Sequence, residues 1–377
     1  MELVAYFKLM AEHAASDLFL SAGARPSLKI DGETRHIGEV RLTSPQVHDM
    51  AFSVMSEKQQ KEFESTFEMN LALNVDNIGR FRVNIYRQRG DVAMVVRYIT
   101  NRIPSIEQLH LPPILKELIM EPRGLILVVG ATDSGKSTAL AAMIDYRNMH
   151  RTGHILTIEE PIEYLHQHKQ SVVDQREVGL DTLSYANALK NAMREAPDVI
   201  MIGEIRDTDI MRQALAYAET GHLCLATLHA ANANQALDRI LHFFTETMRP
   251  ELLLDLSLNL KAVISLRLLR DVDGKRLPAV EVLRSTPHVI DLIQKGEIHK
   301  LKEAIKLGLD QGMQTFDEAL YRLYVGGRIG YSEAITGSDS RTDLALRLRL
   351  EGIGPEEDPG TPSLDQFIDE PTSLPRI

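Results

Sequence analysis

The sequence has few of the residues that several common functions require. It contains one cysteine, Cys224, no tryptophan, and only 5% aromatic residues among its 377. A single thiol can form neither an internal disulfide nor a cysteine zinc cluster, so we expect a reducing compartment and no zinc. The scarcity of aromatics disfavours carbohydrate-binding surfaces and platforms on which bases stack. Because Cys224 lies in an apolar strand-like run, we interpret it as a small buried hydrophobe.

Long apolar runs and an excess of positive charge are also missing. The longest apolar stretch, residues 125–131, is far shorter than the roughly 20 residues that a membrane-spanning helix needs. The first residues show helical apolar spacing instead of the basic-then-apolar pattern of a signal peptide. The 53 Asp and Glu residues outnumber the 42 Lys and Arg residues, which gives a net charge of −11. We therefore expect a cytoplasmic protein that binds no nucleic acid, since phosphate-backbone binders usually carry the opposite charge.

At roughly 150 residues per domain, the chain is long enough for two domains, and its patterns change along its length. Residues 1–100 predict a small α+β domain that ends in a hairpin with arginines on its polar face. Residues 101–113 predict a proline-containing linker. Residues 114–350 predict a second domain in which strand-like runs alternate with helices, typical of a mostly parallel sheet, before mainly helices from about residue 251. Residues 351–377, acidic and rich in proline, predict a disordered tail.

The most specific motif is GATDSGKS at residues 130–137, which fits the phosphate-binding pattern G-x-x-x-x-G-K-[ST]. It follows an apolar strand-like run and precedes a helical segment, as such a loop requires. Backbone N–H groups at the helix start would surround a phosphate, Lys136 would reach the β- and γ-phosphates, and the Ser137 hydroxyl would bind Mg²⁺. The predicted nucleotide-binding residues are Gly130, Ala131, Thr132, Asp133, Ser134, Gly135, Lys136, Ser137 and Thr138.

Three further segments place titratable residues at the ends of apolar strand-like runs. The carboxylates that follow two of these runs are Glu159, Glu160, Glu163 and Glu204. At the carboxyl end of a strand beside a phosphate loop, Glu204 would support Mg²⁺, and a second carboxylate would orient the attacking water. In the third segment, His222 and His229 lie at the two ends of one strand. A structural role stays open for each histidine, but as a pair they are candidate site residues.

Together these segments resemble the four boxes of the secretion ATPase superfamily, which drives type II and type IV secretion and type IV pili. GATDSGKST resembles its Walker A motif, ILTIEEPIEYLH its Asp box, MREAPDVIMIGEIRD its Walker B motif and TGHLCLATLHAANA its His box. The resemblance extends from residue 1 to about residue 345. It implies ATP and Mg²⁺ as ligands and a homo-hexamer, each subunit having a PAS-like N-terminal domain and a RecA-like P-loop domain with a helical C-terminal part.

The resemblance also implies roles for individual residues. Glu163 would be the catalytic carboxylate, Glu204 the Walker B acid that acts through Mg²⁺ and water, and His229 the sensor of the γ-phosphate. Supporting residues would be Glu160, Arg206, Asp207 and His222. Arginines of the N-terminal hairpin would enter the nucleotide site of their own or a neighbouring subunit, with a solvated strand face as the alternative. These arginines are Arg80, Arg82 and Arg97.

Within the superfamily, the chain resembles the PilT-like retraction branch, because it lacks the tetracysteine zinc site and long N-terminal region of the assembly ATPases. The segment HVIDLIQKGE, residues 288–297, and the acidic tail resemble the accessory PilU-type ATPases. This implies a PilT-type partner motor and a PilC-type platform protein, with the chain peripheral at the inner membrane. One departure from the family is Asp133, where glycine is usual.

Two other functions stay open at this point. The first is a regulatory or structural subunit that binds ATP and supports a partner motor with little turnover of its own; Asp133 and the altered segment 288–297 favour it modestly. The second is a DNA-dependent translocase, which the negative charge and the scarcity of aromatics disfavour.

Overall fold

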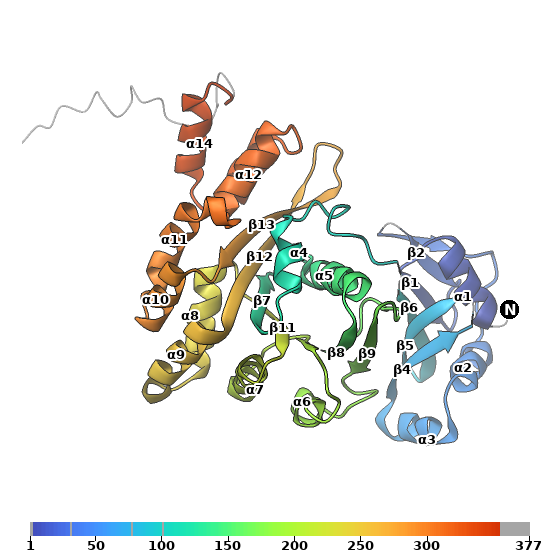
Figure 1. Ribbon diagram of the computed structural model, residues 1–377. Helices are drawn as coiled ribbons and strands as arrows, with labels where there is room; N and C mark the ends of the chain where they lie inside the picture. The colour runs from blue at the N-terminus through green and yellow to red at the C-terminus, as the bar shows by residue number, and fades with distance from the viewer. Residues whose placement is uncertain (1–2, 31, 77, 100–101, 355–377) are drawn as a thin grey trace, which may run out of the picture.

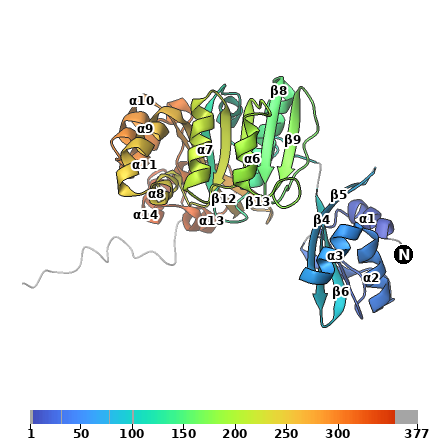
Figure 2. The same cartoon turned by 90° about the horizontal axis from the view of Figure 1, so that it is seen from below.

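The computed structural model describes residues 3–30, 32–76, 78–99 and 102–354. These residues form two sheets, which lie in two lobes of the molecule (Figures 1 and 2). The N-terminal sheet is antiparallel with the order β3-β2-β1-β6-β5-β4, and the second sheet has the order β13-β12-β7-β11-β10-β8-β9. This confirms the predicted class, an α+β domain followed by a P-loop domain. Residues 102–113 between them form neither helix nor strand, and the domain boundaries themselves stay predictions.

The N-terminal lobe packs three helices against its sheet. Its elements are α1 (Leu3–Glu12), β1 (Asp17–Ser21), β2 (Ser27–Ile30), β3 (Glu33–His36), α2 (Ser44–Ser53), α3 (Glu57–Thr66), β4 (Glu68–Val75), β5 (Gly79–Gln88) and β6 (Asp91–Ile99). On β5, Phe81, Val83 and Ile85 are fully buried in the core with the helices. Alternate residues of a strand face opposite sides, so Arg80 and Arg82 lie on the other face, as predicted for this hairpin.

The second lobe contains the parallel strands. Because these strands run in the same direction, their carboxyl ends lie at one edge of the sheet. Its first elements are α4 (Ile114–Ile119), β7 (Gly124–Gly130), α5 (Lys136–His150), β8 (Gly153–Glu159), β9 (Ser171–Glu177), α6 (Tyr185–Ala192), β10 (Val199–Ile202), α7 (Thr208–Glu219), β11 (Leu223–Leu228) and α8 (Ala233–Phe243). Strand β7 is buried along its whole length. Leu125, Leu127 and Val129 pack in the core with α6, α7 and α8, whereas Ile126 and Val128 pack with α4 and α5. Helices therefore cover both faces, as parallel sheets require.

The expectation of mainly helices after residue 251 was partly wrong. The elements there are η1 (Glu246–Met248), α9 (Arg249–Asn259), β12 (Leu260–Arg270), β13 (Arg276–Arg284), α10 (Pro287–Gln294), η2 (Ile298–Lys300), α11 (Leu301–Leu307), η3 (Leu309–Gln311), α12 (Phe316–Val325), α13 (Tyr331–Gly337) and α14 (Arg341–Leu350). Residues 260–284 form an antiparallel hairpin that joins the sheet, with β12 parallel to β7. Strands buried on both faces show no regular alternation of polar and apolar residues, so the sequence of this hairpin has no clear strand pattern.

Two sequence-based expectations concern burial and the chain end. Cys224 on β11 is fully buried, as predicted, and burial raises the pKa of its thiol to about 12. Most of the predicted disordered tail, residues 355–377, lies outside the described residues. Within the described part of the chain, every helix is too short or too polar to cross a membrane.

Candidate active site

The loop between β7 and α5 forms a tight cradle at the carboxyl edge of the sheet. A Cβ atom on Gly130 would lie 2.2 Å from the Ser134 Oγ and 2.6 Å from the Leu266 carbonyl oxygen, so only glycine fits there. Lys136 at the start of α5 is buried, and its Nζ donates to the carbonyl oxygens of Gly130 (3.0 Å) and Ala131 (2.7 Å). Burial lowers the pKa of Lys136, against the opposing effect of nearby carboxylates. The loop thus holds a buried ammonium group at a helix start.

The cradle fits a phosphate group. The hydroxyl of Ser134 is buried and has no hydrogen-bond partner among the described residues. Residues 132–138 line a cavity of about 720 Å³. A phosphate oxygen there would accept from Ser134 and from Lys136, and the amino end of α5 would favour its negative charge. Of the predicted nucleotide-binding residues, 132–138 line this cavity, and Gly130 and Ala131 contribute the carbonyls that hold Lys136.

Charged and polar side chains form a connected series of contacts across the carboxyl ends of β8, β10 and β11. Arg206 donates to Glu160 at 2.6 Å and to Glu204 at 2.7 Å. The other carboxylate oxygen of Glu204 lies 3.2 Å from the Nε2 atom of His229. All four residues line the same cavity as the phosphate loop. The structure therefore brings together four of the predicted site residues that come from three separate boxes.

Glu163 lies on the segment between β8 and β9, and its exposed side chain lines the cavity. The segment is held by Gln175 on β9, whose amide nitrogen donates to the Tyr164 carbonyl oxygen at 2.9 Å and to Glu159 at 3.0 Å. Glu159 is buried and also accepts from Thr157 at 2.7 Å. Because Gln175 contacts Glu159 at the end of β8 and Tyr164 directly after Glu163, these bonds fix the segment without using the Glu163 carboxylate, which lines the cavity.

Sequence reasoning missed several groups of cavity residues, among them Tyr185 on α6 and Arg276 on β13. Residues 108–111, interpreted only as linker, line the cavity beside the phosphate loop. His166 also lines it; its backbone N–H donates to the Gln175 Oε1 at 2.8 Å, and burial lowers the pKa of its imidazole to about 4. Gln175 was missed because β9 was not predicted. The histidine at the end of the Asp box was a visible signal for His166.

Two predicted supporting residues lie elsewhere in the structure. His222 precedes β11 and so lies at the opposite edge of the sheet, where its Nδ1 is 3.2 Å from the Thr220 hydroxyl. Asp207 is the N-cap of α7 and accepts from the Ile210 N–H at 2.9 Å. Among the described residues, neither of the two lines the cavity. Their contacts support the local structure around β11 and α7.

The three hairpin arginines do not line the cavity of their own chain, as far as the described residues show. Arg80 and Arg82 each lie 3.8 Å from Glu177, the buried last residue of β9. Arg97 pairs with Asp17 of β1 at 2.8 Å. Arg80 and Arg82 therefore join the two lobes within one subunit, and entry into the site of a neighbouring subunit stays a prediction.

Asp133 adopts a left-handed backbone conformation, with φ of 60°, and its side chain is exposed. Glycine adopts this conformation freely, and aspartate tolerates it better than most residues. The exposed charge is near the phosphate site, so we expect Asp133→Gly and Asp133→Asn each to tighten ATP binding by about two- to fivefold, the range of an exposed charge interaction. Titration with a fluorescent ATP analogue measures this. Unchanged affinity in Asp133→Asn would show that the charge has no effect.

Glu159 makes the stability of the protein depend on pH. Burial raises the pKa of its carboxyl to about 7 from 4.5, although hydrogen bonds from Thr157 and Gln175 oppose the rise. The folded protein therefore holds this proton more tightly than the unfolded chain, so its stabilising contribution is complete below about pH 4.5 and is lost as pH rises through about 7. The free energy of unfolding of the original protein should therefore fall between pH 5 and pH 8, and in Glu159→Gln this fall should be smaller than in the original protein by about 2 to 3 kcal/mol. Urea unfolding at one protein concentration measures this; equal pH dependence in both proteins would contradict it.

A parallel sheet with a phosphate loop after one strand, and an acidic residue at the end of another strand, defines the class of P-loop nucleoside triphosphatases. Residues 7–307 match the family described as type II/IV secretion system protein, and the chain belongs to this family. It is 52% identical to the type IV pilus ATPase PilU of Pseudomonas aeruginosa, with 93% of this chain and 92% of the relative covered. It is 40% identical to the type IV pilus retraction ATPase PilT of the same organism, with 89% and 97% covered. A crystal structure of the pilus retraction motor PilT with bound ADP superposes with a TM-score of 0.85 at 39% identity, covering 91% of this chain and 98% of the other.

Proposed function

We propose that this chain is a hexameric ATPase that uses ATP hydrolysis to drive type IV pilus retraction, as an accessory motor of the PilU type. One observation carries the proposal: the phosphate loop, Glu163, Glu204 and His229 all line one cavity. This arrangement brings together a phosphate loop, a carboxylate that can orient water, a carboxylate that can support Mg²⁺ and a histidine that can reach the γ-phosphate. The similarity to pilus ATPases over nine-tenths of the chain supports the retraction role.

Each cavity residue has a defined role in this proposal. Lys136 would exchange its bonds to the loop carbonyls for bonds to phosphate oxygens, and the exposed Glu163 carboxylate would orient the attacking water. Ser137 and Glu204 both line the cavity and have the oxygen donors that Mg²⁺ prefers, so these two would hold it. When bound, Mg²⁺ would neutralise charge on the phosphates. His229, beside Glu204, would donate to the γ-phosphate and so distinguish ATP from ADP.

The proposal extends to the neighbours of the chain. In a homo-hexamer, Arg80, Arg82 and Arg97 would face the nucleotide site of an adjacent subunit and stabilise its transition state. A PilT-type motor and a PilC-type platform protein would be the partners, and the second would keep the chain at the inner membrane. Binding of nucleic acid has no place in this function.

Steady-state ATP turnover of the purified chain, measured alone and with the PilT-type motor of the same cell, tests the proposal. We expect turnover by the chain alone, because all the cavity groups come from this subunit or from further copies of it. ATP binding without turnover in either mixture would favour the regulatory subunit instead. Turnover that needs DNA would favour a translocase.

A further inference from the structure

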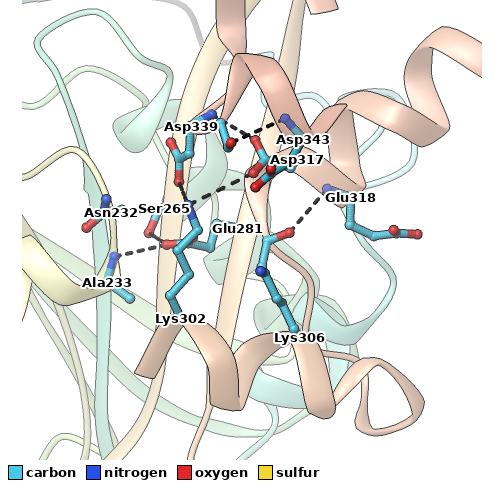
Figure 3. Close-up of polar contacts among 12 residues, drawn as sticks. Asn232, Ala233, Ser265, Glu281, Lys302, Lys306, Asp317, Glu318, Asp339 and Asp343 are labelled. Carbon is cyan, nitrogen blue, oxygen red and sulfur yellow. Dashed lines mark hydrogen bonds and ion pairs between the residues drawn. The ribbon is translucent and has the colours of Figure 1, made fainter. Parts of the chain in front are cut away.

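A buried carboxylate lies outside the cavity, on β13. Glu281 is only 2% exposed. Its Oε1 accepts from the backbone N–H of Ala233 at 3.0 Å and from the hydroxyl of Ser265 at 3.1 Å (Figure 3). Burying a carboxylate is costly unless its partners compensate it, so a role for these two contacts is expected.

The sheet register connects Glu281 with the phosphate loop. Glu281 is paired across the hairpin with Ser265, and Ser265 is paired with Val129 on β7. Val129 is the residue directly before Gly130, where the cradle begins. The Glu281 side chain therefore lies in the same row of the sheet as the residue that precedes the phosphate loop, and its bond to Ala233 ties α8 to that row.

Helix α8 in turn holds His229. His229 lies between β11 and α8, and Arg239 of α8 donates to the His229 carbonyl oxygen at 2.9 Å. The helix cap, Asn232, bonds to the N–H of Gln235, which is within the helix itself. The cap therefore does not attach α8 to other elements. Two other contacts do: the Asn234 amide nitrogen donates to the Ile298 carbonyl oxygen on η2 at 2.9 Å, and the Ala233 N–H donates to Glu281, which is the contact that joins this end of the helix to the sheet. A shift of the amino end of α8 would move His229 away from Glu204, whose carboxylate is now 3.2 Å from it.

We propose that Glu281 is a positioning residue for ATP hydrolysis: its hydrogen bond to Ala233 fixes the amino end of α8 and thereby holds His229 at the cavity. The inference rests on the proposed ATPase function. Glu281 acts as an acceptor of two hydrogen bonds, a role that a glutamine oxygen fills equally well.

The charges around Glu281 fit this role. Burial, the largest effect, and Asp339 raise the pKa of the Glu281 carboxyl, whereas the two hydrogen bonds and the charge of Lys302 on α11 oppose the rise. The amino end of α8 also favours a negative charge there. Lys302 is itself paired with Asp339 at 3.0 Å and lies 4.0 Å from Asp317 (Figure 3). Because Lys302 already has its own partners, removing the Glu281 charge leaves no unpaired ammonium group.

Two substitutions test the inference. Glu281→Gln keeps an acceptor oxygen, and we expect its kcat to stay within about threefold of the original. Glu281→Leu removes the acceptor at similar volume, and we expect kcat to fall by about 10- to 100-fold, as for a catalytic group that is displaced by about 1 Å. The affinity for a fluorescent ATP analogue should stay within threefold in both, because the phosphate loop is unchanged. Equal kcat in the two variants would overturn the inference.

A matched control and a second measurement separate positioning from general destabilisation. Thr315 is the buried N-cap of α12, and its hydroxyl accepts from the Glu318 N–H at 3.2 Å. This cap is not among the described residues that line the cavity, and Thr315→Ala should lower the free energy of unfolding by about 1 kcal/mol. We expect it to leave kcat unchanged. Hydrogen exchange of the amides of residues 229–235 needs no turnover: it should be at least tenfold faster in Glu281→Leu and unchanged in Glu281→Gln. Unchanged exchange in Glu281→Leu would overturn the inference, whereas absence of turnover in the unmodified chain would overturn only the proposed function.

Discussion

Replacing Lys136 with alanine reduces kcat/KM for ATP by about 10²- to 10³-fold, because removal of one preorganised contact to a reacting group in an active site costs this much. The Nζ atom of Lys136 contacts two carbonyl oxygens of the loop, so the change removes a buried charge while the apolar core of β7 stays intact. We therefore expect a folded protein with weak nucleotide binding. Steady-state turnover and titration with a fluorescent ATP analogue measure the two effects.

A second lysine serves as the control. Lys169 pairs with Asp145 at 2.6 Å and, among the described residues, does not line the cavity. Lys169→Ala should keep turnover within about twofold, since such a pair contributes about 1 kcal/mol or less. If Lys136→Ala retained more than one-tenth of the original turnover, the nucleotide would have to bind elsewhere.

Glu163→Gln lowers kcat by about 10²- to 10⁴-fold, the contribution of a residue that takes part in proton transfer or orients the nucleophile. Because glutamine has the same shape without the charge, and Gln175 holds the segment through Glu159 and Tyr164 instead, the cavity should keep its form. We expect the affinity for ATP to change by threefold or less. This split between kcat and binding distinguishes Glu163 from Lys136, which affects both.

An exposed carboxylate outside the cavity provides the control for Glu163. Glu117 on α4 lies 3.8 Å from Arg284, and Glu117→Gln should leave kcat within about twofold. If Glu163→Gln had an unchanged kcat, Glu163 could not be the water-orienting carboxylate. The buried Glu159, with its raised pKa, would then be the next residue to test.

The sequence predicted the parts of the site that depend on contiguous residues. A phosphate loop needs its glycines, lysine and hydroxyl within eight positions, so Lys136 and Ser137 could be read directly. Glu204 and His229 could be assigned to one site because parallel strands bring their carboxyl ends to one edge, and in the structure the two side chains lie 3.2 Å apart. Local sequence patterns and one rule of sheet topology were sufficient to assign these residues to the site.

The remaining features depend on contacts between distant parts of the chain. Glu281 accepts from Ala233, 48 positions earlier, so its burial has no local signature; in VEVLR it resembles the exposed residue of an alternating strand. The strands β12 and β13 lack regular alternation because both of their faces are covered. The contact of Arg80 and Arg82 with Glu177 depends on how the two lobes pack, which no local pattern encodes.

The central claim is that ATP hydrolysis in this cavity drives pilus retraction. Retraction of individual pili, followed in a strain that lacks this chain and is complemented with either the original chain or Glu163→Gln at equal abundance, tests it most directly. We predict that the original chain restores retraction and that Glu163→Gln, which still binds ATP, does not. Full restoration of retraction by Glu163→Gln would contradict the claim.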